Sequence, residues 1–79
     1  MRVLFFAQLK DETACNSIEL PVSSPLNVEQ LWMLLLEKFP ALDGHRNHVR
    51  LARNWEYAGP DAQFHNEDEV ALIPPVSGG

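Results

Sequence analysis

The chain ends in Pro74-Pro75-Val76-Ser77-Gly78-Gly79, and this segment holds the residues best suited to chemistry. Two prolines end strand pairing and stiffen the exit from a fold. Gly78 and Gly79 have no Cβ, so they can enter a narrow channel and bring a terminal carboxylate close to the catalytic groups of another protein. A carboxylate is a poor electrophile, and nothing in the sequence is placed to activate it. We therefore expect a separate enzyme to activate the Gly79 carboxylate.

Other reactive residue types lack the spacing that a site requires. His45 and His48 are three apart and His65 is distant, so surface histidines are a better interpretation than a metal site, and we expect no metal. Cys15 has no CxxC partner, which favours an inert thiol over a nucleophile. Glu67-Asp68-Glu69 is most simply a solvated turn, with a docking patch for a basic partner as the alternative. No dinucleotide, P-loop or zincin motif occurs.

Length and charge limit the possible classes. A chain of 79 residues supplies one small domain. Eleven Asp and Glu against six Lys and Arg give a formal charge of −5, the wrong sign for a surface that binds nucleic acid. The apolar runs are far below the ~20 residues that span a bilayer, so we expect no membrane partner. One cysteine forms no internal disulfide, which predicts a reducing, cytoplasmic location.

The N-terminal third favours two strands. Val3–Ala7 is a continuous apolar run typical of a buried strand. Residues 18–22 alternate apolar and polar side chains, as a half-exposed strand does, and Pro21 places that position at an edge. The polar stretch 10–13 between them predicts the turn of a hairpin.

One amphipathic helix follows. Asn27 is a helix N-cap with Gln30 three residues later, a variant of the capping box, and Leu26 and Leu31 are spaced for a hydrophobic staple. Pro40 disfavours helical geometry at the residue before it, so the helix ends at residue 39. The residues that share its apolar face are Val28, Leu31, Trp32, Leu35 and Phe39, and those opposite are Glu29, Gln30, Met33 and Glu37.

The remaining residues predict a loop over 41–47, a third strand around 49–53, a short strand at 55–57 and a last apolar strand at 70–73. This order indicates an α+β fold in which one main helix packs on one face of a mixed sheet. The first and last strands are nearly all apolar, which is expected if they lie parallel in the centre of the sheet.

Strand alternation also predicts a docking surface. If Val3 and Val70 face the helix, Phe6 and Ile73 face outward on neighbouring strands, and Tyr57 joins them. An exposed apolar patch beside the C-terminal segment would mark a protein interface. The alternative is that a loop of this same chain covers Phe6 or Ile73.

The pattern resembles the ubiquitin-like β-grasp family, and within it the small sulfur-carrier subunits of molybdopterin synthase. The matching stretches are Val3–Ala7, Asn54 before the short strand, and residues 68–79 at the end, with a helix in the matching position between them. Family members commonly carry an Arg-Glu pair after the first strand and a Gly before the Asp-Glu-Val, where this chain has Lys10-Asp11 and Glu67. The resemblance implies a β-grasp domain over residues 1–75 and a flexible, extended functional tail over 76–79.

The resemblance implies a role for that tail. An E1-like adenylating enzyme would use ATP and Mg to convert the Gly79 carboxylate into an acyl adenylate, and sulfur from a donor system would displace AMP to leave a thiocarboxylate. Pro75, Val76, Ser77 and Gly78 would insert with it into the large subunit of molybdopterin synthase, in a 2:2 assembly. There the sulfur would pass to a cyclic pyranopterin monophosphate. The chain itself would be a sulfur-donating subunit without a stably bound cofactor.

Three other classes stay open. Another β-grasp sulfur carrier, of the thiazole type, would keep the tail chemistry and change the acceptor. A protein modifier would be attached to lysines through Gly79. A structural adaptor would not need Gly79 at all.

Overall fold

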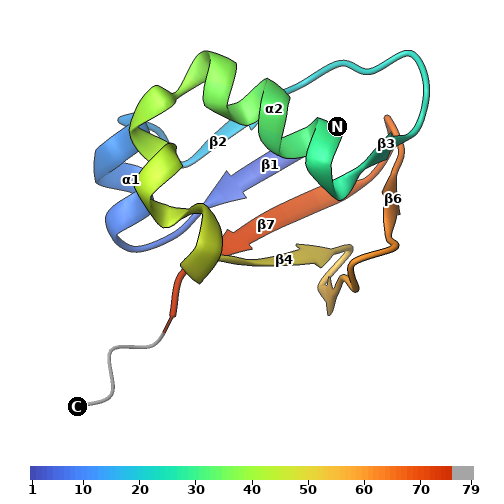
Figure 1. The fold of residues 1–79 in the computed structure, drawn as a ribbon. Coiled ribbons are helices and arrows are strands. Elements are labelled where there is room, and N and C mark those ends of the chain that lie inside the picture. Colours follow the sequence, from blue (N-terminus) through green and yellow to red (C-terminus); the bar gives the residue numbers. More distant parts are fainter. Residues whose placement is uncertain (76–79) are drawn as a thin grey trace.

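The computed structural model describes residues 1–75 (Figure 1). The predictions for Val76, Ser77, Gly78 and Gly79 concern residues outside this range. None of the helices within residues 1–75 has the length and apolar content to cross a bilayer. In chain order the elements are β1 (Arg2–Phe5), α1 (Gln8–Thr13), β2 (Ser17–Glu19), β3 (Leu26–Asn27), α2 (Val28–Lys38), the 3-10 helix η1 (Pro40–His48), β4 (Arg50–Arg53), β5 (Glu56–Tyr57), β6 (Gln63–Phe64) and β7 (Glu69–Ile73).

The main sheet has five strands in the order β2-β1-β7-β4-β5. Strands β1 and β7 are parallel, with Val3 opposite Val70 and Phe5 opposite Leu72. The other pairs in this sheet are antiparallel. The prediction that the first and last strands lie side by side and parallel in the centre is confirmed. Both strands lie in the interior of the sheet, with a paired strand on each side, and this position fits their almost uninterrupted apolar runs.

Helix α2 begins and ends where the sequence predicts. The backbone N–H of Gln30 donates to Asn27 Oδ1 at 2.8 Å, and the N–H of Asn27 donates to Gln30 Oε1 at 2.9 Å, so both halves of the capping box are present. The helix ends at Lys38, before Pro40. Three residues of its predicted apolar face are fully or nearly fully buried: Leu31, Trp32 and Leu35.

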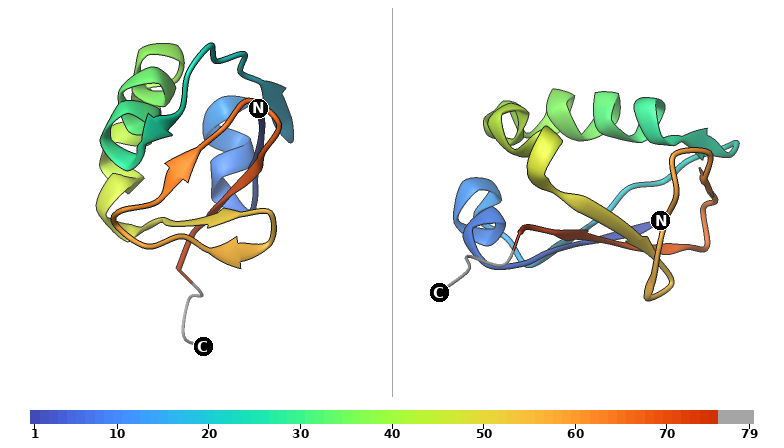
Figure 2. Two further views of the ribbon diagram at one scale, coloured as in Figure 1. Left: turned by 90° about the vertical axis from the view of Figure 1, so that its right-hand side faces the viewer. Right: turned by 60° about the horizontal axis from the view of Figure 1, so that its bottom comes forward.

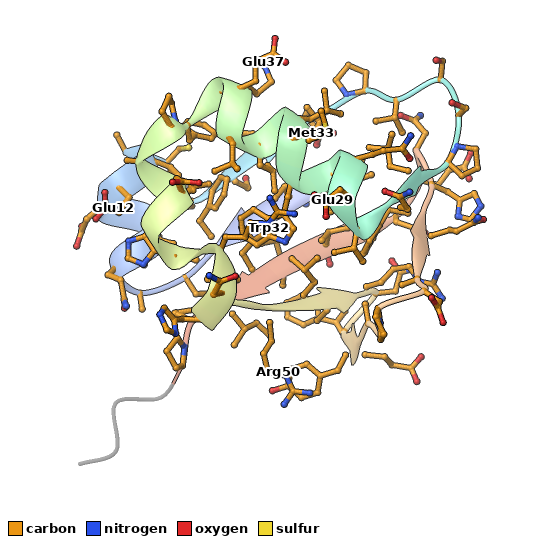
Figure 3. The ribbon with its side chains drawn as sticks, viewed as in Figure 1. Glu12, Glu29, Trp32, Met33, Glu37 and Arg50 are labelled. Atoms are coloured by element: carbon orange, nitrogen blue, oxygen red, sulfur yellow. The ribbon has the colours of Figure 1, made fainter. Side chains whose placement is uncertain are left out.

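The helices lie on one side of the main sheet (Figure 2). The side chains of Val3, Phe5, Val70 and Leu72 point into the core on that side, and each is at most 1% exposed. The Phe5 ring meets Phe39 edge-on, with ring centroids 5.5 Å apart. Figure 3 shows Trp32 between α2 and the sheet, whereas Met33 and Glu37 point away from it. The predicted arrangement of one main helix on one face of a mixed sheet is confirmed.

Residues 8–13 form helix α1 rather than the predicted polar turn. Leu9 and Thr13, one helical turn apart, are both buried, and the Thr13 hydroxyl donates to the Leu9 carbonyl at 2.9 Å. Ala7 and Ala14 flank the helix with φ angles of 52° and 60°, which reverse the chain at each end. A six-residue helix with two buried positions carries too little periodicity for the sequence to reveal it.

Three further differences concern short elements. The first strand stops at Phe5 and the second covers Ser17–Glu19, so both are shorter than predicted. The predicted loop after α2 is the 3-10 helix η1, which buries Leu42. Strands β3 and β6 form a separate two-stranded sheet, with Leu26 opposite Phe64, that the sequence does not predict. Two-residue strands show no alternation, and only the tertiary contacts bring them together.

Candidate functional site

We call the face of the main sheet opposite α2 the open face. Across β1, β7, β4 and β5, the register places Leu4, Ala71, Ala52 and Tyr57 in one row on this face. The two alanines are buried at 3% exposure each, and Leu4 is half-buried. In the described part of the chain no helix lies over this face (Figure 2).

All three residues predicted to form a docking patch lie on or at the rim of the open face. Tyr57 is 60% exposed and Phe6 38%, so no loop of the described chain covers either ring. Ile73 is half-buried at the end of β7. The sequence predicts that Phe6 lies inside the first strand. In the structure it follows Phe5, the last residue of β1. The structure therefore places the three side chains on one surface.

Arg50 adds a positive charge to this surface. It pairs with Ile73 across β4 and β7, and its guanidinium Cζ lies 4.0 Å from the centroid of the Tyr57 ring. Such stacking is attractive because the face of an aromatic ring is electron-rich. The stacked pair orients Tyr57 and leaves a cation beside the apolar side chains.

Trp55 is a residue of this face that sequence reasoning did not assign to it. It forms, with Asn54, the two-residue turn between β4 and β5, and its side chain is 67% exposed. Together with Leu4, Phe6 and Lys10 it lines a shallow hollow of about 350 Å³. The sequence predicted Trp55 as part of a short strand, because an aromatic residue beside Glu56 and Tyr57 fits strand composition.

The turn at Asn54 and Trp55 has an unusual backbone. Their φ angles are 51° and 70°, so both central residues have positive φ, as in a type I′ turn. Asparagine tolerates this region, but a tryptophan there costs roughly 1 kcal/mol or more relative to glycine. A turn of this kind usually carries Asn-Gly. The second position of this turn is therefore occupied by a residue that the backbone disfavours.

Asn54 fixes the turn to the start of β7. Its side-chain amide donates to Asp68 Oδ1 at 3.1 Å, and its Oδ1 accepts from the backbone N–H of Glu69 at 3.0 Å. The backbone N–H of Asn54 donates to the Glu69 carbonyl at 2.7 Å. These bonds explain why an asparagine precedes the short strand, one of the features on which the family resemblance was based.

Asp68 is a hydrogen-bonded residue rather than a solvated one. Its Oδ2 accepts from the backbone N–H of His65 at 2.8 Å, and its side chain is 14% exposed. Desolvation raises the pKa of this carboxyl, but the hydrogen bonds from His65 and Asn54 and the nearby charges of His65 and Arg53 outweigh it. The net effect is a pKa below the ordinary value of 3.8. The interpretation of 67–69 as a solvated turn is therefore wrong for Asp68, whereas Glu67 is exposed.

The histidines and the cysteine do not assemble a second site. His45 Nε2 lies 3.4 Å from Glu12 Oε1, and His65 Nδ1 lies 3.6 Å from Asp68 Oδ2. Cys15 is half-buried. Within residues 1–75, no three His, Cys, Asp or Glu side chains gather in a way that could hold a metal ion.

The chain leaves the fold beside the open face. Strand β7 ends at Ile73, between β1 and β4, and Pro74 and Pro75 follow it. Phe6 after β1 and Arg50 at the start of β4 therefore flank the exit point on either side. The end of β7 therefore adjoins residues of the predicted docking patch.

This fold is the ubiquitin-like β-grasp, and the chain matches the ThiS family over residues 3–79. It therefore belongs to the ThiS family. The molybdopterin synthase sulfur carrier subunit of Arabidopsis thaliana is 37% identical to it over 79 residues, which cover all of this chain and 82% of the relative.

Solved structures show the same fold. The crystal structure of SAMP1 from Haloferax volcanii matches with a TM-score of 0.86 at 29% identity, over 100% of this chain and 98% of that one. A complex of subunits 1 and 2 of the molybdopterin-converting factor from Helicobacter pylori contains a chain that matches with a TM-score of 0.71 at 23% identity, over 99% of this chain and 96% of that one. The second likeness shows the fold alone.

Proposed function

We propose that this chain is the sulfur carrier subunit of a molybdopterin synthase, with the Gly79 carboxylate as the group that carries sulfur. The observation that carries the proposal is the full-length similarity to a molybdopterin synthase sulfur carrier subunit, together with a family match that runs through Gly79. The Gly-Gly ending supplies a terminus that can enter a narrow active site.

Other proteins activate the Gly79 carboxylate and supply the sulfur. An E1-like adenylating enzyme joins the Gly79 carboxylate to the α-phosphate of ATP, with Mg as the counter-ion, and pyrophosphate leaves. Sulfide (HS⁻) from a donor system then attacks the acyl carbon. A C–S bond forms, the C–O bond to AMP breaks so that AMP leaves, a proton is released, and a thiocarboxylate remains. In this proposal the acids and bases for both steps belong to the partner proteins.

The next step takes place in the large subunit of the synthase. Residues 75–78 follow Gly79 into that subunit, and the thiocarboxylate transfers its sulfur to a cyclic pyranopterin monophosphate. Phe6, Tyr57 and Ile73 on the open face form the docking surface. Phe6 and Ile73 lie where the chain leaves the fold, and Tyr57 stacks on Arg50, which pairs with Ile73. A solved complex of two molybdopterin-converting subunits, one with this fold, supports a large-subunit partner. The 2:2 stoichiometry and a cytoplasmic location belong to the same proposal.

Loading with sulfur tests the proposal. The full chain is incubated with the adenylating enzyme, ATP, Mg and a sulfur donor, and its intact mass is measured. We expect the mass change of one oxygen replaced by sulfur, and no change when ATP is omitted. Deletion of Gly78 and Gly79 is the matched control, because it removes no described core residue. That variant should keep the far-UV circular dichroism of the wild type and should not be loaded. A wild-type chain that never gains sulfur contradicts the proposal.

A second candidate is a protein modifier. The likeness to SAMP1, the small archaeal modifier protein 1 of Haloferax volcanii, favours it. In that case the activated Gly79 carbonyl forms an amide bond to a lysine amine of another protein. Conjugates of higher mass that require Gly79 would support this function. Transfer of sulfur to a pyranopterin without such conjugates would support the carrier, and sulfur transfer to a thiazole precursor would assign the thiazole type.

A further inference from the structure

Trp55 combines two features that the fold alone does not explain. Its backbone φ of 70° is one that glycine adopts easily and tryptophan does not. Its indole is 67% exposed and therefore contributes little to the core. A strained backbone that carries an exposed aromatic side chain points to a use outside the fold.

The position of the indole indicates what it contacts. Trp55 lines the hollow on the open face with Leu4 and Phe6 as its apolar walls. Phe5 also lines it, and Lys10, Asn16 and Ser17 complete its rim. The hollow shares Phe6 with the docking patch and is therefore continuous with the surface beside the chain exit. A partner that covers that surface also meets Trp55.

Charge indicates the chemistry of that partner. The chain carries a formal charge of −5, yet the cations near the open face include Lys10 at the rim of the hollow and Arg50 on the Tyr57 ring. Among residues 1–75, neither forms an ion pair with a carboxylate within 4.0 Å. A partner surface with an apolar side chain for the hollow and carboxylates beside it complements this arrangement.

We propose that Trp55 is a specificity-determining docking residue for the large synthase subunit. An apolar side chain of that subunit enters the hollow formed by Leu4, Phe6 and Trp55, and a carboxylate of that subunit faces Lys10. This inference rests on the proposed function. Between the two protein partners that handle the tail, the large subunit is the occupant, because a solved complex of subunits 1 and 2 of a molybdopterin-converting factor contains a chain of this fold.

The decisive variant is Trp55→Gly, because glycine relieves the positive φ while it removes the indole. We expect its melting temperature to equal or exceed that of the wild type, and its Kd for the purified large subunit to rise roughly tenfold or more. Trp55→Phe should show a smaller rise. Met33→Ala is the control, since Met33 is 63% exposed on α2, on the other side of the molecule, and should leave the Kd unchanged.

A measurement on the unaltered chain gives an independent result. Its two tryptophans differ in exposure, because Trp32 is 3% exposed and Trp55 67%. Acrylamide should therefore quench Trp55 selectively in the free protein. Excess large subunit without tryptophan, or with its tryptophans replaced, should remove that quenching.

Several results would overturn the inference. They are an unchanged Kd for Trp55→Gly, a marked fall in its melting temperature, or quenching that persists in the complex. Slower sulfur loading with an unchanged Kd for the large subunit would instead assign Trp55 to the adenylating enzyme and also overturn it. Failure of the proposed function looks different, because then the wild-type chain itself gains no sulfur.

Discussion

Phe5 and Phe6 are neighbours in sequence, and they show how differently the two faces of the sheet are used. Phe5 is 1% exposed, under α2, with its ring against Phe39. Phe6 is 38% exposed on the side that no described helix covers. The covered face holds the fold together, whereas the open face carries aromatic and cationic side chains beside the chain exit. Substitutions on the two faces should therefore affect different measurements.

The largest effect is expected from Phe5→Ala. Removing a fully buried phenylalanine leaves a cavity and should lower the free energy of unfolding by about 3–5 kcal/mol. For a domain of this size that is a large part of the total stability. Urea denaturation followed by circular dichroism measures it. A loss below about 1 kcal/mol would show that the covered face is not the main source of stability.

Phe6→Asp is the matched change on the open face. It should alter the free energy of unfolding by about 1 kcal/mol, because the ring is partly exposed, but weaken binding to the large subunit roughly a hundredfold. A carboxylate in an apolar interface has no partner there and adds a desolvation penalty. Calorimetric titration gives the Kd, and denaturation gives the stability. If the variant is unfolded, Phe6 belongs to the core and the contrast between the faces fails at this position.

Asn54→Ala tests how the turn that carries Trp55 is held. The variant loses the side-chain bonds to Asp68 and to the Glu69 backbone, and alanine disfavours a φ of 51°, so the free energy of unfolding should fall by about 2 kcal/mol. Asn54→Gly keeps the backbone conformation and loses only the hydrogen bonds. Its free energy of unfolding should therefore lie between those of the wild type and Asn54→Ala. Equal stability of the alanine variant and the wild type would mean that neighbouring strands alone fix the turn.

The smallest effect is a pH dependence from Asp68. Its folded pKa lies below 3.8, so its carboxylate stabilises the folded state above that pH, and the contribution is lost as the pH falls through the lowered folded pKa. Asp68→Asn should flatten this part of the stability profile measured by urea denaturation at acidic pH. Asp43→Asn, at an exposed position in η1, is the control and should keep the wild-type slope. An unchanged slope for Asp68→Asn would show that the Asp68 carboxyl does not cause this pH dependence.

The elements that the sequence predicts well are those with strong local signals. Asn27 and Gln30 mark the start of α2, Pro40 marks its end, and the apolar spacing between them identifies the buried side. Helix α1 was missed because only Leu9 and Thr13 carry its pattern. Trp55 was assigned to a strand, and the positive φ of the turn depends on bonds to residues 68 and 69, which no local pattern reveals.

The sequence by itself determined the α+β class, the central apolar strands and the Gly-Gly ending, because these follow from composition and from the spacing of near neighbours along the chain. The tertiary structure decided which side chains share the open face. Val3 meets Val70 across the sheet, and the register of strands so far apart in sequence sets the neighbours of Phe6, Tyr57 and Ile73. It also decided that Trp55 lines a hollow on this face with Leu4 and Phe6. Such long-range pairings are stabilised by packing between distant segments, and the spacing of near neighbours along the chain does not reveal that packing.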